Sequence, residues 1–235
     1  MANTKKIKVK TKTEQKQEQE AISLDVQLSK SEAFIEKNFK PILYCLAAIV
    51  IVVAGWFIWK NHMKNVEKEA QVAIHTSQKL FGQQQWDNAL KGDGANNIGF
   101  LRVIDEYSGT KTANLAKLYA AICYANTEKY DEAIKYFEDF SPKDDQIISP
   151  AAVAALGNCY VEKGETAKGA ETLIKAAKKA NNDAVSPVFL VQAANLYKSL
   201  NQNEKALELY NEVKTKYFRS PLSTQVEKYI EELSK

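Results

Sequence analysis

Hydrophobic and polar positions divide the chain into three stretches with different patterns. Residues 1–20 consist mainly of Lys, Glu, Gln and Thr, whereas residues 41–59 read PILYCLAAIVIVVAGWFIW and carry no charge. From about residue 97 onward, apolar positions recur at helical spacing between short turns, and no convincing alternation of period two appears. We therefore predict an all-α protein in which one uncharged helix precedes a series of amphipathic helices.

The uncharged run is predicted to form a transmembrane helix over residues 41–60. At about 1.5 Å of rise per residue, a helix of this length crosses a hydrocarbon core of about 30 Å. Lys40 and Lys60 flank the run, and Trp56 and Trp59 lie near its end, where aromatic rings favour the headgroup layer. Forty residues precede the run and no small-residue cleavage site follows it, so we expect a retained anchor rather than a signal peptide. A buried helix of a soluble domain is the alternative, but core helices rarely run this long without a charge.

The segments that flank the run have their own patterns. Residues 1–28 form a basic tail with too little apolar surface to offset chain entropy, so we predict that it is disordered. Ser29 and Glu32 have capping-box spacing, which predicts a juxtamembrane helix over 29–40 with a break or bend before the proline that starts the span. Residues 61–81 keep helical periodicity, which indicates a helix that extends from the membrane and packs on the following domain.

A repeated pattern of small and large residues runs through the second half of the chain. Tyr124, Tyr160 and Tyr197 are spaced by 36 and 37 residues, each with a small residue three positions before it, a small residue nine positions after it and a large residue four positions further on. This pattern resembles the tetratricopeptide repeat (TPR), whose helix pairs approach closely at the small residues while the large ones fill the space between successive pairs. The matching sets are Ala121, Tyr124, Ala133 and Phe137; Gly157, Tyr160, Gly169 and Leu173; and Ala194, Tyr197, Ala206 and Tyr210.

The resemblance implies a TPR-type α-solenoid over residues 61–235, after the transmembrane helix. This domain would contain a degenerate helix pair, three matching repeats and a capping helix. Their predicted ranges are 61–107 for the degenerate pair, 114–145, 150–182 and 187–219 for the repeats, and 222–233 for the capping helix.

The order of the segments narrows the resemblance. A lysine-bearing tail, the helix SEAFIEKNFK and a span ending in GWFIW precede an Ala-rich helix and the repeats. This layout resembles the ancillary SecYEG translocon subunit family (YfgM-like). The resemblance implies an inner-membrane protein with a periplasmic TPR domain, located beside the Sec channel, that helps to hand emerging secretory chains to periplasmic chaperones.

Charge is concentrated at the N-terminal end. Residues 1–40 contain nine lysines and six acidic residues, which accounts for the whole formal net charge of +3. The neutral remainder argues against a nucleic-acid partner. The lysines of the tail favour a cytoplasmic N-terminus, with the domain on the outer side of the membrane, which is periplasmic if the resemblance holds. Counts close to the span do not decide the topology, because residues 21–40 hold three lysines and residues 60–79 hold four.

The sequence contains no pattern typical of catalysis or of cofactor binding. Phosphate-binding, dinucleotide-binding and nucleophile-elbow motifs are absent, and His62 and His75 lack the partners of a metal-binding motif. Cys123 and Cys159 fall at equivalent positions of adjacent repeats, where stacked helices lie about 10 Å apart and disulfide geometry is out of reach. We therefore expect no enzymatic activity, no cofactor and no metal, and we interpret both thiols as small buried apolar groups.

A TPR array is expected to bind through the concave groove lined by the first helix of each pair. Asn158 and Asn195 lie at matching places in this groove, where their amides either hydrogen-bond a peptide backbone or only contact water. None of the groove positions is basic, which argues against the mode in which a TPR groove grips a C-terminal carboxylate. The predicted positions are Leu115, Leu118, Ile122, Asn126, Ala151, Ala154, Asn158, Glu162, Val188, Val191, Asn195 and Ser199.

These expectations favour a membrane-anchored interaction protein, with a periplasmic chaperone-like or accessory role at the Sec translocon as the leading hypothesis. The expected partners are the lipid bilayer and proteins, namely Sec channel subunits, secretory chains or periplasmic chaperones. The alternatives are an envelope scaffold without chaperone activity and, if the topology is reversed, a cytosol-facing TPR receptor. The sequence leaves the oligomeric state open.

Overall fold

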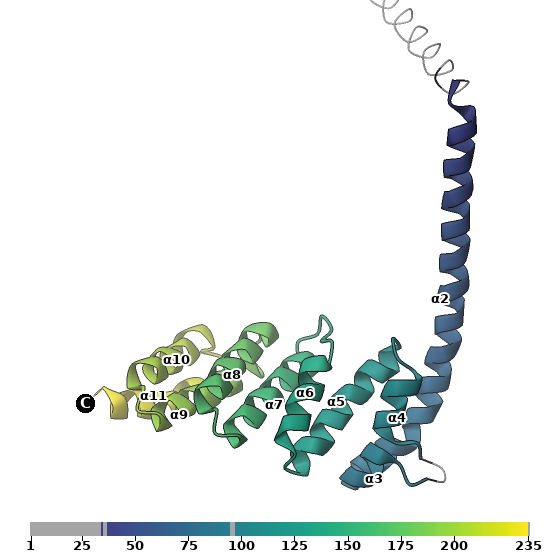
Figure 1. The fold of residues 1–235 in the computed structure, drawn as a ribbon. Coiled ribbons are helices and arrows are strands. Elements are labelled where there is room, and N and C mark those ends of the chain that lie inside the picture. Colours follow the sequence, from purple (N-terminus) through teal and green to yellow (C-terminus); the bar gives the residue numbers. More distant parts are fainter. Residues whose placement is uncertain (1–33, 35–36, 95–96, 235) are drawn as a thin grey trace, which may run out of the picture. The chain divides into compact units, whose positions relative to one another are not determined.

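The computed structural model describes residue 34 and residues 37–94 and 97–234, and every regular element in these residues is an α-helix (Figure 1). The chain forms two compact units, Met1–His62 and Met63–Lys235. Helix α2 (Phe39–Gly82) begins in the first unit and ends in the second. The predicted disordered tail at 1–28 and most of the predicted juxtamembrane helix at 29–40 lie outside the described residues.

Within the first unit, α2 continues through Pro41 without a break. The backbone N–H of Asn38 donates to the carbonyl oxygen of Phe34 at 3.0 Å, and that of Ile42 donates to Asn38 at 3.0 Å. Pro41 lies in the first turn of α2, where its missing N–H removes no helical hydrogen bond. Asn38, a turn residue between the helical residues Lys37 and Phe39, lies directly before α2, close to the break or bend predicted near residue 40.

The large apolar side chains of α2 from Leu43 to Trp59 are exposed. Between Leu43 and Trp59, the large apolar side chains keep 46% to 73% of their surface accessible. Side chains of this kind are normally buried when a helix belongs to a water-soluble core. In length and composition, this part of α2 suffices to cross a membrane.

The second unit contains the end of α2 and a row of shorter helices that follow one another in chain order (Figure 1). Each helix from α3 onward packs against the next one, so contacts between neighbours build the array, as in other α-solenoids. The helices are α3 (Trp86–Lys91), α4 (Gly99–Glu106), α5 (Lys111–Asn126), α6 (Tyr130–Asp139), α7 (Ile148–Glu162), α8 (Thr166–Ala180), α9 (Ser186–Ser199), α10 (Asn203–Lys216) and α11 (Leu222–Leu233).

Small residues let the two helices of a pair approach closely, most clearly in the α7–α8 pair. A Cβ atom placed on Gly169 would lie 2.8 Å from the carbonyl oxygen of Gly157 and would collide with the side chain of Val161. A Cβ atom on Gly157 would in turn lie 3.1 Å from the carbonyl oxygen of Gly169. In the α5–α6 and α9–α10 pairs the corresponding residues are fully buried alanines, namely Ala121, Ala133, Ala194 and Ala206.

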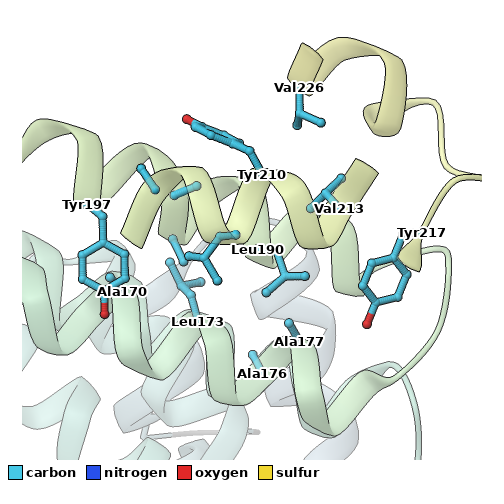
Figure 2. Packing of buried hydrophobic residues seen from close by; sticks show 14 of the residues in the cluster. Ala170, Leu173, Ala176, Ala177, Leu190, Tyr197, Tyr210, Val213, Tyr217 and Val226 are labelled. Carbon is cyan, nitrogen blue, oxygen red and sulfur yellow. The ribbon is translucent and has the colours of Figure 1, made fainter. Parts of the chain in front are cut away.

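Large side chains fill the space between successive pairs. Figure 2 shows Leu173 of α8, Leu190 of α9, Tyr210 of α10 and Val226 of α11 in one buried cluster. The ring of Tyr210 also stacks on Tyr229 of α11 with a centroid separation of 5.3 Å. Helix α11 therefore covers apolar surface at the end of the array that would otherwise face water.

The segment 61–107 differs from the predicted helix pair. After α2, the second half of that pair is divided into α3 and α4 by a loop that begins at Gly92. Gly92 and Gly99 have φ angles of 90° and 80°, and a Cβ atom on either residue would collide with backbone atoms. The carbonyl oxygen of the buried Asn97 side chain accepts a hydrogen bond from Ser77 Oγ at 2.6 Å, and its Nδ2 donates to the carbonyl oxygen of Asn88 at 2.7 Å. These bonds hold Asn97 against α2 and α3, and α4 begins two residues later, at Gly99.

Candidate protein-binding groove

Two hollows lie between consecutive first helices of the array. Leu115 and Ile122 are two turns apart on one face of α5, and each lines one of the hollows, so both hollows open along the same face of that helix. The α2–α5 hollow has a volume of about 410 Å³ and is lined by Glu67, Gln71, Ile74, Gln78, Lys111, Thr112 and Leu115. The α5–α7 hollow has a volume of about 350 Å³ and is lined by Ile122, Ala125, Asn126, Tyr130, Phe137, Ala155, Asn158, Cys159 and Glu162. We call the two hollows together the groove.

In the α2–α5 hollow, Glu67 of α2 binds the N-terminal end of α5. Its carboxylate accepts hydrogen bonds from the backbone N–H of Lys111 at 2.7 Å, from the hydroxyl of Thr112 at 2.8 Å and from Gln71 Nε2 at 3.1 Å. Partial burial raises the pKa of Glu67, but the hydrogen bonds from Thr112, Gln71 and Lys111 together outweigh it and leave the pKa lowered. The carboxylate also faces the positive end of the α5 dipole. Glu67 is thus engaged by the scaffold and fixes α5 against α2.

The α5–α7 hollow combines apolar walls with a polar rim. Asn126, Asn158 and Glu162 are exposed at the rim, and Tyr130 adds a partly exposed aromatic ring from the start of α6. Protein ligand sites commonly pair apolar surface for contact area with a few polar groups that fix orientation. The apolar walls come from Ile122, Ala125, Phe137 and Ala155.

The structure brings only part of the predicted groove together. Leu118 and Ala154 are buried, with 8% and 4% of their surface accessible, because they face neighbouring helices inside the core. Neither residue lines one of the two hollows. The predicted residues that do line a hollow are Leu115, Ile122, Asn126, Asn158 and Glu162.

The predicted residues of α9 line neither hollow. These are Val188, Val191, Asn195 and Ser199, of which Val191 is partly buried and the others are exposed.

The asparagines of the predicted groove have different partners. Tyr210 Oη donates to Asn195 Oδ1 at 2.6 Å, so this amide oxygen is engaged within the α9–α10 pair. Asn126 Nδ2 donates to the carbonyl oxygen of Ile122 at 2.8 Å. With the described residues, Asn158 makes no side-chain hydrogen bond. Of the two asparagines at matching places, Asn158 is therefore the one whose whole amide is open to a partner.

Several groove residues were not predicted from the sequence. Glu67, Gln71 and Gln78 belong to the end of α2, which lacks the small-and-tyrosine pattern that marks the first helices of the repeats. Ala155 lines the hollow at the place where Ala154 was predicted. The two residues are adjacent alanines, so their residue type does not indicate which one faces the hollow. The stripe on α7 is therefore Ala151, Ala155, Asn158 and Glu162, a regular helical spacing on one exposed face.

Cys123 and Cys159 are free and buried. Burial raises the pKa of Cys123 to about 12 and the pKa of Cys159 to about 11, with smaller contributions from the carboxylates of Asp87 and Glu162. Both thiols therefore stay protonated at neutral pH and pack as apolar groups.

Comparison with known proteins agrees with this architecture. A family model described as a tetratricopeptide repeat-like domain matches residues 32–157, which is more than half of the chain. The chain belongs to this tetratricopeptide repeat-like family. Domains of this kind generally bind other proteins, so the groove is a candidate protein-binding surface. The match identifies the broad family and leaves the narrower resemblance to SecYEG subunits as a hypothesis.

Solved structures with similar folds include two of one protein. The crystal structure of a putative kinesin light chain from Podosopora anserina, with nearly identical TPR-like repeats, has a TM-score of 0.54 at 12% identity and covers 71% of this chain and 86% of that chain. A single-substitution variant of the same protein has a TM-score of 0.53 at 12% identity, with coverage of 71% and 85%. At this level of identity the likeness shows the α-solenoid fold alone. A comparison with curated proteins gave no match.

Proposed function

We propose that this protein is a membrane-anchored adaptor that binds partner proteins through the TPR-like groove. One observation carries the proposal: the same chain contains an uncovered apolar helix and a repeat array whose groove has apolar walls and a polar rim. Such a molecule acts by holding its partners close to a membrane, so its role is binding rather than catalysis.

The exposed side chains between Leu43 and Trp59 support the membrane anchor. An α-helix satisfies its own backbone hydrogen bonds, so lipid can cover these side chains without leaving polar groups unpaired. Lys60 Nζ lies 4.7 Å from the centroid of the Trp56 ring. A lysine and a tryptophan at the end of an apolar helix are typical of the boundary between hydrocarbon and water.

We propose further that the domain is periplasmic and binds secretory chains or subunits of the Sec channel as a chaperone-like or accessory component. The order of the segments, the lysines of the tail and the resemblance to ancillary SecYEG subunits support this proposal. The groove also fits clients of varied sequence. The amide of Asn158 suits backbone groups, which all polypeptides share, and the apolar walls accept different side chains.

Photocrosslinking from the groove tests the partners. A photoreactive amino acid is placed at Asn158 in the full-length chain within native membranes, and light is expected to give adducts with Sec channel subunits, secretory chains or periplasmic chaperones. The matched control carries the same probe at Glu208, which is exposed on α10 and lines neither hollow. Equal adducts from both positions, or adducts with none of these partners, would count against the proposal.

Protease accessibility tests the topology. In right-side-out spheroplasts, an external protease should digest the second unit and leave the tail protected. Digestion confined to inverted vesicles would instead support a cytosol-facing receptor.

An aggregation assay separates a chaperone-like role from that of an envelope scaffold, if the topology is as proposed. The full chain in detergent is mixed with an unfolded secretory protein, and a chaperone-like protein should suppress its aggregation, whereas a scaffold should not.

A further inference from the structure

The α5–α7 hollow collects negative charge at one end. Glu162 is the last residue of α7, and its exposed side chain lines the hollow. Asn126 is the last residue of α5 and lines the same hollow. The C-terminal end of a helix carries a partial negative charge, so an acidic residue there is unfavourable on its own. Two helix C-termini and one carboxylate thus lie at the same cavity.

No cation of the described residues forms an ion pair with Glu162. The neighbouring Lys163 pairs with Asp131 instead. Glu128, in the turn after α5, is exposed and is likewise in no ion pair with the described residues. Burial is the largest cause of the raised pKa of Tyr130, and the carboxylates of Glu162 and Glu128 add to it. Both carboxylates at this end of the hollow are therefore without an ion-pair partner among the described residues.

The walls of the hollow suit the stem of a long side chain. Ile122 and Ala155 are partly exposed apolar residues on opposite walls, and Tyr130 presents a ring beside them. Lysine and arginine lay their methylene stems on apolar surface while the charged group contacts a carboxylate or an aromatic face. The next repeat contains such an arrangement within the chain, where Lys168 Nζ lies 3.8 Å from the centroid of the Tyr160 ring.

We propose that the α5–α7 hollow binds a lysine or arginine side chain of the partner polypeptide, with the cation at Glu162 and the stem against Ile122 and Ala155. The inference rests on the proposed function, because it assigns the chemistry of one side chain within a polypeptide that the groove binds. An acidic side chain would be repelled at this place. A neutral one would leave the carboxylate and the helix ends without a counter-charge.

A peptide array tests the inference with the full-length chain in detergent micelles. The probes are 13-residue peptides with one fixed apolar frame and a central lysine, arginine, norleucine, citrulline or glutamate. We expect the lysine and arginine peptides to bind about three- to tenfold more tightly than their neutral analogues, as a charge-assisted contact at a partly exposed site implies. The glutamate peptide should bind most weakly.

Two variants and one control assign the effect to the hollow. Glu162→Gln should remove the preference for the cationic peptides, and Glu162→Lys should reverse it in favour of the glutamate peptide. Glu208→Gln removes an exposed carboxylate of α10 that lines neither hollow, and it should leave the preference unchanged. Because Glu162 is exposed, both variants should fold, and circular dichroism checks this.

The outcomes separate the two proposals. Equal binding of cationic and neutral peptides, or a preference that survives Glu162→Gln, would overturn the basic side-chain site while leaving the protein-binding role intact. Failure of the chain to bind any peptide of the array, together with failure of the crosslinking experiment, would overturn the proposed function and this inference with it.

Discussion

Gly157 and Gly169 lie where α7 and α8 approach each other closely. The space for a Cβ atom at either glycine is taken by atoms of the α7–α8 pair, including the carbonyl oxygen of the other glycine. Contacts of this kind depend on single atoms, because protein interiors are packed as densely as organic crystals. The structure therefore makes sharp predictions for individual residues.

Gly169→Ala is expected to destabilise the protein by about 1–3 kcal/mol, because the added methyl group forces α7 and α8 apart. The new Cβ atom would lie 2.8 Å from the carbonyl oxygen of Gly157. Chemical denaturation of the full chain in mild detergent, followed by circular dichroism, measures the change. Gly82→Ala is the matched control, since a Cβ atom at this helix end meets nothing within 4 Å. A loss at Gly169 no larger than that at Gly82 would show that the pair has room to adjust.

Glu67→Gln is expected to lower stability by about 1 kcal/mol at pH 7, because the carboxylate that binds the start of α5 is replaced by a weaker acceptor. The pKa of Glu67 is lowered in the folded state, so its contribution is present above the ordinary value of 4.5 and is lost as pH falls below that value through the folded pKa. The difference between wild type and variant should therefore shrink in acid. Denaturation midpoints measured from pH 7 to pH 3 check this.

Glu69→Gln is the control for this pH dependence, since Glu69 is an exposed neighbour on the same helix. A difference between wild type and Glu67→Gln that stayed constant through the acid range would mean that the hydrogen bonds do not depend on the charge of Glu67.

The sequence predicted the residues that pack the pairs better than those that line the groove. Close packing restricts the size of the residues at the small and tyrosine positions of the repeats, so these positions form a recognisable pattern in the sequence. The exposed stripe of α7 has no such requirement. Ala154 faces the core and Ala155 faces the hollow, although the two residues are chemically identical. Only the rotation of the helix, set by packing against its neighbours, distinguishes them.

At the scale of whole elements, the prediction was weakest in the segment before the first matching repeat. The capping helix was predicted at 222–233, and α11 occupies Leu222–Leu233. By contrast, segment 61–107 was predicted as one helix pair, and its second half is two short helices separated by a loop. That loop depends on the side chain of Asn97 bonding to Ser77, a contact between residues twenty positions apart that local patterns do not reveal.

Deletion of α11, residues 222–235, is expected to loosen the end of the array. Val226 is fully buried against α10, and burial of one such side chain contributes about 1.5 kcal/mol or more. Because each helix contacts mainly its neighbours, amides of α9 and α10 should exchange hydrogen faster while those of α5 stay unchanged. Hydrogen exchange with mass spectrometry on the full-length chain measures this.

The control for the deletion removes only residues 234–235, which follow α11. Faster exchange spread evenly along the array would show that it unfolds as one cooperative unit, in conflict with stabilisation by neighbouring contacts.

At the scale of the whole molecule, net charge, exposed apolar surface and the groove lie in different parts of the chain. The formal net charge of +3 lies in residues 1–40, the exposed apolar surface lies between Leu43 and Trp59, and the groove lies in the second unit. Each part has a composition suited to a different surrounding. If lipid covers the apolar part of α2, charges introduced there should disturb membrane attachment, and equal charges later in the same helix should not.

Replacing Ile51 and Val52 together by lysine is therefore expected to release the chain from membranes. Both side chains are about 70% exposed in the middle of the apolar run, and each lysine at the centre of a membrane-spanning helix costs about 2.5–3.5 kcal/mol. Carbonate extraction followed by sedimentation measures the fraction that stays in the membrane. The matched control places two lysines at Val72 and His75, exposed positions of α2 beyond the run, and this variant should stay in the pellet. If both double variants stayed in the pellet, or both left it, the apolar run of α2 would not be the part of the chain that lipid holds.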